Sequence, residues 1–270
     1  MDLDSQFGMK GKTTLVVGGR GHLGAAFCEA LAQAGSLVYS ADLREPEQAS
    51  ASSSIRQITM DVTDEQSVGR AVEQVVEDAG RVDSLVYSVT AKPTDFYMPF
   101  TQCSLDGWRH VFQAEMDGLF LTSQRVGAVM ERQAEGSMVF LSSIYGVVGN
   151  DQRIYEGSNL ADVYLDGGEA PRRIFSHAAY PAVKGGIISL ARYLAAYWAG
   201  AGIRVNSLSP GGVEHEGENL SFVKKYSERT PLGRKARPDE VACAVVFLAS
   251  GASSYVTGHN LLVDGGWTAW

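Results

Sequence analysis

The chain has 270 residues, of which 45% are hydrophobic, and its formal net charge at pH 7 is -8. A chain of this length can bury a substantial core as one α/β domain, and an acidic balance without any run of Lys and Arg argues against a nucleic-acid partner. No apolar run approaches the roughly 18 residues of a membrane span, and residues 1–12 lack the basic and apolar regions of a secretory signal. We therefore expect a cytoplasmic protein that binds neither nucleic acid nor a membrane.

Short apolar runs alternate with helix-period stretches along the chain, and these runs are the expected strands. Strict alternation of strand and helix implies right-handed crossovers and a parallel sheet. The sequence thus predicts one α/β domain over residues 1–270, a doubly wound (Rossmann) seven-stranded parallel sheet with helices on both faces. The strand candidates are Thr14 to Gly18, Leu37 to Ala41, Ile55 to Met60, Leu85 to Val89, Met138 to Leu141, Val205 to Leu208, and Asn260 to Val263.

Three of the intervening helices have clear signals. Two show apolar residues at helical spacing, and the third begins at Pro238, where proline and two following carboxylates suit a first turn. The apolar faces expected to be buried are Leu23, Ala26, Phe27, Ala30 and Leu31, then Val68, Ala71, Val72, Val75, Val76 and Ala79, and finally Val241, Ala244, Val245 and Leu248.

Two stretches break the alternation. Residues 45–54 are rich in Ser and Ala and are expected to form a flexible surface loop. Residues 149–176, here called the insertion, are too long for an ordinary connection and lie directly before Tyr180, which favours a lid or substrate loop. A decoration with no role toward substrate is the alternative.

The cysteines and histidines give no sign of a disulfide framework or a metal site. Cys28, Cys103 and Cys243 are far apart and odd in number, and they have no Cys-x-x-Cys spacing. No pair among the five histidines has metal-ligand spacing. We expect buried thiols in a reducing compartment and no metal.

The first expected strand runs into a glycine-rich turn that opens directly into a helix. Glycines allow a tight turn and a close approach of the backbone to a pyrophosphate, which the amides and dipole of the helix then hold. The strand before and the helix after supply the context that this mechanism requires. The predicted dinucleotide-binding residues are Gly18, Gly19, Arg20, Gly21, His22, Leu23 and Gly24.

Asp42 ends the second expected strand, where a carboxylate can accept hydrogen bonds from an adenosine ribose. This favours NAD over NADP, because a 2′-phosphate would face a negative charge. Arg20 and Arg44 keep NADP open, since a nearby guanidinium could pair with that phosphate, although either arginine could simply be solvated.

Tyr180 and Lys184 are four residues apart and therefore lie on one face of a helix that is expected to continue through Leu194. A phenol with its ordinary pKa of about 10 is a poor proton carrier at neutral pH, but an adjacent ammonium stabilises the phenolate. Such a pair can give or take a hydroxyl proton while hydride moves to or from a nicotinamide.

Further motifs surround this pair. They are Ser142-Ser143 at a strand end, Tyr180-Pro-Ala-Val-Lys184-Gly-Gly, Ile203-Arg-Val-Asn206-Ser-Leu-Ser-Pro210-Gly211, and Val263-Asp264-Gly265-Gly266. With the glycine-rich turn, they resemble the short-chain dehydrogenase/reductase family along nearly the whole chain.

The resemblance implies that Ser143 binds the substrate oxygen, that Tyr180 is the acid/base, and that Lys184 both tunes Tyr180 and holds the nicotinamide ribose. It also implies a homotetramer or homodimer, with interfaces on the helices around residues 108–131 and 180–200. Beyond the glycine-rich turn and Asp42, the implied cofactor contacts are Asp61, Val62, Tyr180, Lys184, Pro210, Gly211 and Val213.

The chain departs from the family pattern in the spacing of its site residues. Ser143 and Tyr180 are much farther apart than is usual, so the insertion lies between them. Tyr155 stands at the usual distance from Ser143, but Asn159 occupies the place of its lysine. We therefore assign the acid/base to Tyr180.

Other departures concern single positions. His22 replaces the middle glycine of the turn, which gives a spacing like that of extended family members, and His215 falls where a threonine often meets the carboxamide. The usual Asn-Asn-Ala-Gly appears as Tyr87-Ser88-Val89-Thr90, and Glu115 stands in place of the asparagine that supports proton relay. Cofactor binding is expected to survive these changes, whereas the relay is not expected in its usual form.

Three segments resemble a family branch associated with flagellin or surface-sugar modification. They are Ser143-Ile-Tyr-Gly-Val-Val-Gly149, Ile154-Tyr-Glu-Gly157 and Asp264-Gly-Gly-Trp267. This resemblance implies a nucleotide-activated sugar or a nonulosonate precursor as substrate. Arg153, Arg172 and Arg173 of the insertion could then meet phosphates, or they could be ordinary solvated charges.

The leading hypothesis is an NAD(P)-dependent oxidoreductase that interconverts a secondary alcohol and a ketone on a small polar, sugar-like substrate. A sugar epimerase or dehydratase that retains its NAD is a second hypothesis, favoured by the glycine spacing and disfavoured by the length of the chain. A cofactor-binding scaffold or sensor without catalysis is a third, motivated by Glu115 and His22.

Overall fold

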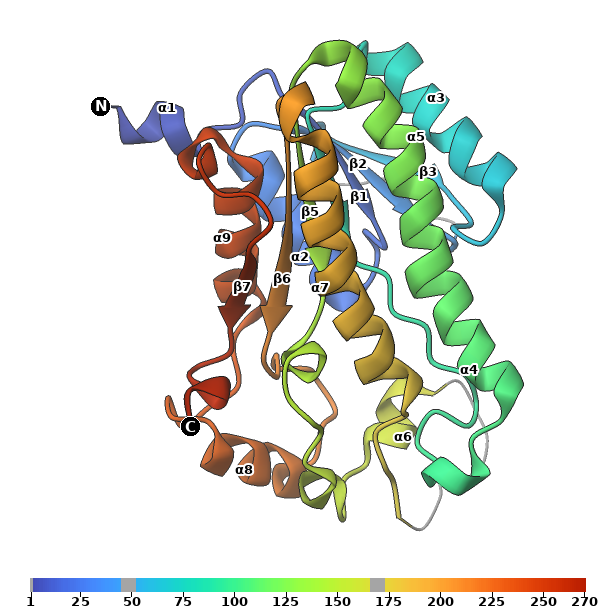
Figure 1. Cartoon of the computed structure of the whole chain (residues 1–270). Coiled ribbons are helices and arrows are strands. Elements are labelled where there is room, and N and C mark those ends of the chain that lie inside the picture. Colours follow the sequence, from blue (N-terminus) through green and yellow to red (C-terminus); the bar gives the residue numbers. More distant parts are fainter. Residues whose placement is uncertain (1, 45–51, 166–172) are drawn as a thin grey trace.

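The computed structural model describes residues 2–44, 52–165 and 173–270, and Figure 1 shows its ribbon. In chain order the strands are β1 (Thr13–Val17), β2 (Leu37–Asp42), β3 (Ile55–Thr59), β4 (Ser84–Tyr87), β5 (Gly136–Leu141), β6 (Ile203–Pro210) and β7 (Asn260–Val263). They form one parallel seven-stranded sheet in the order β3-β2-β1-β4-β5-β6-β7. The predicted doubly wound, Rossmann-like sheet is thus confirmed, and each expected strand lies within a few residues of an observed one.

Helices connect the strands and cover both faces of the sheet. The helices are α1 (Leu3–Phe7), α2 (His22–Gln33), α3 (Glu65–Ala79), α4 (Leu105–Phe112), α5 (Gly118–Gln133), α6 (Leu160–Tyr164), α7 (Ala179–Trp198), α8 (Leu220–Arg229) and α9 (Pro238–Ala249). A π-helical turn, η2 (Gln113–Asp117), joins α4 to α5. Short 3-10 turns are η1 (Phe100–Gln102), η3 (Ile144–Gly146), η4 (Gln152–Tyr155), η5 (Ala199–Ala201), η6 (Gly251–Ser253) and η7 (Trp267–Ala269). Among the described residues, no helix has the length and apolar character needed to cross a membrane.

The core has two layers, one on each face of the sheet. Helices α3, α5 and α7 pack on one face through residues such as Val72, Val126 and Ala191. Helices α2 and α9 pack on the other face, where Phe27 and Val245 belong to one apolar cluster. In Figure 1, α7 and α5 run in front of the sheet, and α9 lies at its β7 side. The inner strands β1, β4 and β5 are buried throughout, and this burial on both faces explains their short, mainly apolar runs, whereas the edge strands β3 and β7 are only partly buried.

The predicted helix faces agree with the burial in most positions. In α3, Val68, Ala71, Val72 and Val75 are buried as expected. In α2 the buried residues are Gly24, Phe27, Cys28 and Leu31, so that Leu23, Ala26 and Ala30 only flank the core.

The expectation of buried thiols holds for only one of the cysteines. Cys28 is buried and Cys103 is partly buried, but Cys243 is exposed. The expectation was wrong for Cys243 because it lies on the solvent side of α9, one position beyond the buried Ala242.

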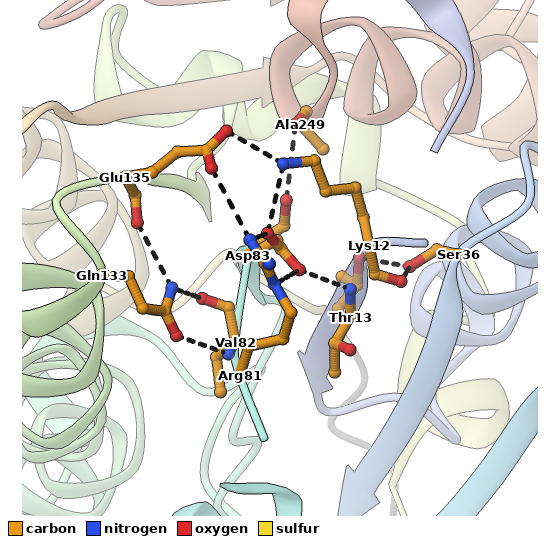
Figure 2. A network of polar contacts seen from close by, with 11 residues as sticks. Lys12, Thr13, Ser36, Arg81, Val82, Asp83, Gln133, Glu135 and Ala249 are labelled. Carbon is orange, nitrogen blue, oxygen red and sulfur yellow. Dashed lines mark hydrogen bonds and ion pairs between the residues drawn. The ribbon is translucent and has the colours of Figure 1, made fainter. Parts of the chain in front are cut away.

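A polar network joins the amino ends of β1, β4 and β5, as Figure 2 shows. The Asp83 carboxylate, which is almost fully buried, accepts hydrogen bonds from the backbone N–H of Thr13 and from Nε of Arg81, both at 2.8 Å. Lys12 Nζ lies 3.3 Å from Asp83 and 2.9 Å from Glu135. These contacts fasten the sheet at the edge opposite to the carboxyl ends of its strands.

Two predicted loop segments are only partly described. The surface loop expected at 45–54 lies outside the described residues up to residue 51, and residues 52–54 form a turn that leads into β3. Within the insertion, η4 and α6 are described, and residues 166–172 lie outside the described range.

Candidate active site

A cavity of about 390 Å³ lies at the carboxyl edge of the sheet. The strand order reverses between β1 and β4, and in open α/β sheets ligands bind at such a switch point. The cavity brings together many residues that the sequence placed in one site. Those that line it are Gly21, His22, Leu23, Gly24, Ser143, Tyr180, Lys184, Pro210, Gly211 and Val213.

The glycine-rich turn forms a cradle that only glycine can form. Gly18 has a φ of +77°, and a Cβ added at Gly24 would collide with the carbonyl oxygen of Gly18. A Cβ at Gly19 would collide with the hydroxyl of Ser40 on β2. The bare backbone and the amino end of α2 therefore fit a pyrophosphate, whose charge the helix amides and dipole would favour.

Asp42 stands at the end of β2, beside this cradle. Its carboxylate accepts a hydrogen bond from the backbone N–H of Arg20 at 3.0 Å and lies 3.6 Å from Nε of Arg44. The Arg20 guanidinium donates instead to the carbonyl of Ser40 at 3.2 Å and to the Gln57 side chain at 2.6 Å. Of the two arginines considered for a 2′-phosphate, only Arg44 has a largely exposed guanidinium.

Asp61 and Val62 follow β3 at the same edge of the sheet but do not line the cavity. Asp61 Oδ1 accepts hydrogen bonds from the backbone N–H and hydroxyl of Thr63 at 2.8 Å and 2.7 Å. Val62 is 9% exposed and packs against Gly118 of α5. The cofactor contact that the family resemblance implies for these two residues stays a prediction.

His22 and His215 connect the glycine-rich turn to the segment between β6 and α8. Their rings are 4.8 Å apart, and His22 Nε2 is 2.7 Å from the carbonyl oxygen of Glu214. His215 also packs against Tyr164 of the insertion, with ring centroids 4.8 Å apart. Histidine at position 22 therefore links the turn to the segments that cover the cavity.

Tyr180 and Lys184 lie on one face of α7, as their spacing predicts, and Ser143 follows β5 on the same cavity. Lys184 Nζ lies 5.4 Å from the centre of the Tyr180 ring and donates to the carbonyl oxygen of Leu141 at 3.2 Å. The hydroxyl of Ser142 donates to the backbone carbonyl of Lys184 at 2.8 Å, which fixes α7 against the end of β5.

Glu115 forms an ion pair with Lys184, with 2.8 Å between Oε2 and Nζ. Its other oxygen accepts the backbone N–H of Ala91 at 3.1 Å, after β4. Burial by itself lowers the pKa of Lys184, but the Glu115 carboxylate and the Tyr180 phenol outweigh it, so that the pKa is raised. The lysine is therefore an ammonium at any physiological pH.

The π-helical turn η2 carries Glu115 on the helix that approaches α7. Such turns insert an extra residue into a helix and are frequent at functional sites. The sequence placed Glu115 where the family has an asparagine, but it gave no sign that the carboxylate pairs directly with Lys184.

The insertion lines the cavity and is bound to the segment around α8. Asn159 donates from Nδ2 to Gly217 O at 2.7 Å and accepts the N–H of Asn219 at 2.8 Å. Asn219 in turn donates to Gly157 O at 2.8 Å, and Arg229 of α8 lies 2.8 Å from Asp151. The described part of the insertion and the β6–α8 segment thus form one continuous cover.

Tyr155, the alternative acid/base by spacing, is buried and lines the same cavity. Its ring packs against Phe222 of α8 with centroids 5.9 Å apart. Asn159 stands where the lysine partner of Tyr155 would be, and its side chain instead forms hydrogen bonds with Gly217 and Asn219. Of the three lysines that line the cavity, Lys184 is the one on α7, and its Nζ lies 5.4 Å from the centre of the Tyr180 ring. The assignment of the acid/base to Tyr180 stays a prediction.

The two insertion arginines that the structure describes, Arg153 and Arg173, do not line the cavity. Arg153 is exposed and pairs with Asp151 at 2.8 Å, and Arg173 packs on the ring of Phe175; Arg172 lies outside the described residues. The charged groups found on the cavity but missed in the sequence are Lys92, Glu218 and Lys235. Lys92 follows closely after β4, and this position at the carboxyl edge is the one signal that could have indicated it.

Comparison with known proteins supports the same assignment over the whole chain. A profile described as short chain dehydrogenase matches residues 12–161, more than half of the chain. The chain belongs to the short-chain dehydrogenase/reductase family. A second profile, described as enoyl-(acyl carrier protein) reductase, matches residues 163–268. The chain is accordingly an NAD(P)-dependent oxidoreductase.

Similar proteins include enzymes named for sugar alcohols. A D-threitol dehydrogenase of Mycolicibacterium smegmatis is 31% identical over 99% of this chain and 97% of its own length. A galactitol 2-dehydrogenase (L-tagatose-forming) of Cereibacter sphaeroides is 32% identical, and both chains are covered completely, to 100%.

Two solved structures have the same fold. One is a short-chain dehydrogenase from Leptospira borgpetersenii with bound NAD+, at a TM-score of 0.85 and 29% identity over 99% of this chain and 96% of that one. The other is a gluconate 5-dehydrogenase from Burkholderia cenocepacia with NADP and tartrate, at a TM-score of 0.82 and 27% identity with both chains covered to 100%. The narrower resemblance to a surface-sugar branch stays a prediction.

Proposed function

We propose that this enzyme interconverts a secondary alcohol and a ketone on a polyol or ketose, with Ser143, Tyr180 and Lys184 as its catalytic residues. The observation that carries the proposal is that these three side chains line one cavity beside a glycine cradle, although the insertion separates them in sequence. We further propose that residues 1–270 act as a single catalytic domain.

The proposed roles follow from the chemistry of each group. A bound nicotinamide would supply or accept the hydride. The Tyr180 hydroxyl gives a proton to the substrate oxygen during reduction and takes it back during oxidation. The Lys184 ammonium favours the phenolate form of Tyr180, and the Ser143 hydroxyl donates a hydrogen bond to the substrate oxygen.

A polyhydroxylated substrate is supported by the composition of the cavity and by the similar proteins. The rings of Tyr97, Tyr145, Tyr155 and Tyr164 line it and supply apolar walls, and a phenol hydroxyl can donate or accept a hydrogen bond. The hydroxyl of Tyr164 already donates to Glu218. The threitol and galactitol dehydrogenases described above act on substrates of this kind by their names.

We propose NAD as the cofactor, because the Asp42 carboxylate meets the position expected for the adenosine ribose and the Arg20 guanidinium is occupied by protein acceptors. Arg44 is the group through which NADP use would arise. We place the enzyme in the cytoplasm, since its three cysteines are free.

A homodimer or homotetramer is proposed from the exposed faces of α5 and α7. Phe120 is 55% exposed, and Tyr193 and Tyr197 are each 63% exposed and stack on one another, and aromatic side chains are enriched in protein interfaces. Mass measured by light scattering should exceed that of one chain, and a Tyr193→Glu and Tyr197→Glu double variant should lower it. An unchanged monomer mass in both proteins contradicts the proposed assembly.

The function is tested with polyols and ketoses in the presence of NAD or NADH, with hydride transfer followed by nicotinamide absorbance. Tyr180→Phe should bind NAD as the wild type does in calorimetry and lose turnover. Tyr155→Phe, which alters the tyrosine that stands at the usual family distance from Ser143, should keep hydride transfer. Turnover in Tyr180→Phe equal to that of the wild type would reject the assignment, and retained NAD without net NADH change would favour an epimerase.

A further inference from the structure

Lys92 stands out among the charged groups of the cavity because nothing in the described chain neutralises it. It lies in the segment after β4 and lines the cavity together with Tyr180 and Lys184. Its ammonium is 4.0 Å from the centre of the Tyr164 ring on α6. No carboxylate among the described residues forms an ion pair with it.

The other two lysines on the cavity each have their own carboxylate. Lys184 pairs with Glu115 at 2.8 Å, and Lys235 pairs with Glu218, with both members of the second pair almost fully buried. Glu218 also accepts a hydrogen bond from the Tyr164 hydroxyl at 3.1 Å. Both carboxylates are therefore already used by other partners.

The cavity consequently holds one uncompensated positive charge in a chain whose net charge is -8. Burial lowers the pKa of Lys92, Glu115 opposes this effect and Lys184 adds to it, and together they bring the pKa to about 8. Lys92 is partly buried. An ammonium that is partly removed from water and has no anionic partner is unfavourable, so such a group on the wall of a ligand cavity indicates a partner that arrives with the ligand.

We propose that Lys92 binds a carboxylate of the substrate, so that the enzyme acts on a polyhydroxylated acid in preference to the corresponding neutral polyol. A single lysine matches the single charge of a carboxylate. A phosphate dianion would call for a second free cation, and no arginine or further unpaired lysine lines the cavity in the described chain. The inference rests on the proposed function, since it specifies the substrate of that site.

The ring of Tyr164 gives the insertion a part in this recognition. A cation held over an aromatic face is stabilised without being neutralised, so Lys92 remains able to pair with an anion. Because the Tyr164 hydroxyl is bound to Glu218, the cover of the cavity holds the ring in place beneath the ammonium.

The test compares matched substrates that differ only in one terminal group: D-gluconate with D-glucitol, D-galactonate with galactitol, and D-glucitol 6-phosphate as the phosphate arm. The wild type should have a higher kcat/KM for the acid of each pair. Lys92→Met should reduce the ratio of acid to polyol at least tenfold, mainly through KM, and Lys224→Met, which removes an exposed charge from α8, should leave the ratio as in the wild type. A wild-type preference for the polyol or for the phosphate, or an unchanged ratio in Lys92→Met, overturns the proposal while the oxidoreductase function stands.

The pH dependence of the preference for the acid is a second test, which does not depend on the uncharged Lys92→Met variant. The groups acting on Lys92 are Glu115, Lys184 and Tyr164, and its pKa of about 8 means that it is charged below that pH and loses its charge above it. The preference for the acid should therefore decline as the pH rises through about 8 in the wild type. In Lys92→Arg it should persist, because arginine stays charged, and a parallel decline in both proteins contradicts the role of Lys92.

If neither member of any pair is oxidised, the polyol function fails and the anion site is tested by binding alone. Titration of D-gluconate into the NAD-loaded wild type should release or absorb heat with saturation. Lys92→Met should bind at least tenfold more weakly, and D-glucitol should not compete. Equal binding by the two proteins, or no binding by the wild type, overturns the proposal independently of turnover.

Discussion

Glu115 and Lys184 form an ion pair of 2.8 Å in which the side chains are 0% and 1% exposed. A buried lysine ordinarily loses its proton because the charged form is poorly solvated. Here the carboxylate keeps the ammonium charged, and hydrogen bonds to Ala91 N and Leu141 O satisfy further atoms of the pair. The site thus retains a charged lysine beside Tyr180 without the asparagine usual in the family.

Replacing Glu115 by Gln should destabilise the fold and shift the activity profile. The variant leaves a buried ammonium unpaired, for which we expect a loss of about 3 kcal/mol in the free energy of unfolding, measured in urea. Because burial lowers the pKa of Lys184 and the opposing carboxylate is gone, the decline of kcat/KM at high pH should move to lower pH. Glu65→Gln, which breaks an exposed pair with Arg125 at 2.8 Å, should cost less than about 1 kcal/mol. An unchanged pH dependence of kcat/KM in Glu115→Gln would mean that Glu115 does not influence the proton transfer at Tyr180.

Asn159→Ala should weaken substrate binding more than turnover. The change removes the bonds to Gly217 O and from Asn219 N, which join the insertion to the segment before α8. Loss of about 1.4 kcal/mol of cover stability corresponds to a roughly tenfold rise in the KM for the alcohol, with the KM for NAD unchanged. Glu156→Ala removes an exposed side chain from the same insertion and should behave as the wild type. Equal effects of the two variants would mean that these bonds do not hold the cover.

Asp42→Ala should change the choice of cofactor. Removing a carboxylate that can accept ribose hydrogen bonds should reduce kcat/KM for NAD by roughly 30-fold, equivalent to about 2 kcal/mol. The ratio of NADP to NAD efficiency should rise, since the repulsion of a 2′-phosphate is lost and Arg44 remains. The double variant with Arg44→Ala should lose the gain in NADP use. A constant ratio in all three proteins would place the ribose elsewhere.

Asp83→Asn should destabilise the protein without affecting its chemistry. Asp83 is buried at the amino edge of the sheet, where Thr13, Arg81 and Lys12 all present donors to it (Figure 2). An amide cannot satisfy all of these donors, so we expect a loss of about 2 kcal/mol in urea unfolding and an unchanged kcat. Asp78→Asn, at an exposed pair with Arg56 of 3.6 Å, serves as the control and should be nearly neutral. A fall in kcat for Asp83→Asn at temperatures where it is folded would contradict the separation of the two edges.

The strands and most helices could be predicted because their signals are local. The mainly apolar runs at β1, β4 and β5 and the apolar stripe of α3 reflect burial in elements with a regular repeat, and the proline at the start of α9 suits a first helical turn. Such signals can be recognised from neighbouring residues alone. Cys243 shows the limit of this reasoning. A small side chain on a helix can face either way, and the packing of α9 leaves this one in solvent.

The sequence by itself determined the sheet, the glycine cradle and the spacing that places Tyr180 and Lys184 on one face of a helix, because each depends on neighbours only a few positions apart. Only the tertiary structure decided which charges meet. Glu115 pairs with Lys184, which lies 69 positions later in the sequence (184 − 115). Glu218 accepts a hydrogen bond from Tyr164 and forms an ion pair with Lys235. Lys92 is left with an aromatic ring and no carboxylate in the described chain. Such pairings follow from how distant segments pack at the carboxyl edge of the sheet, and no local pattern encodes them.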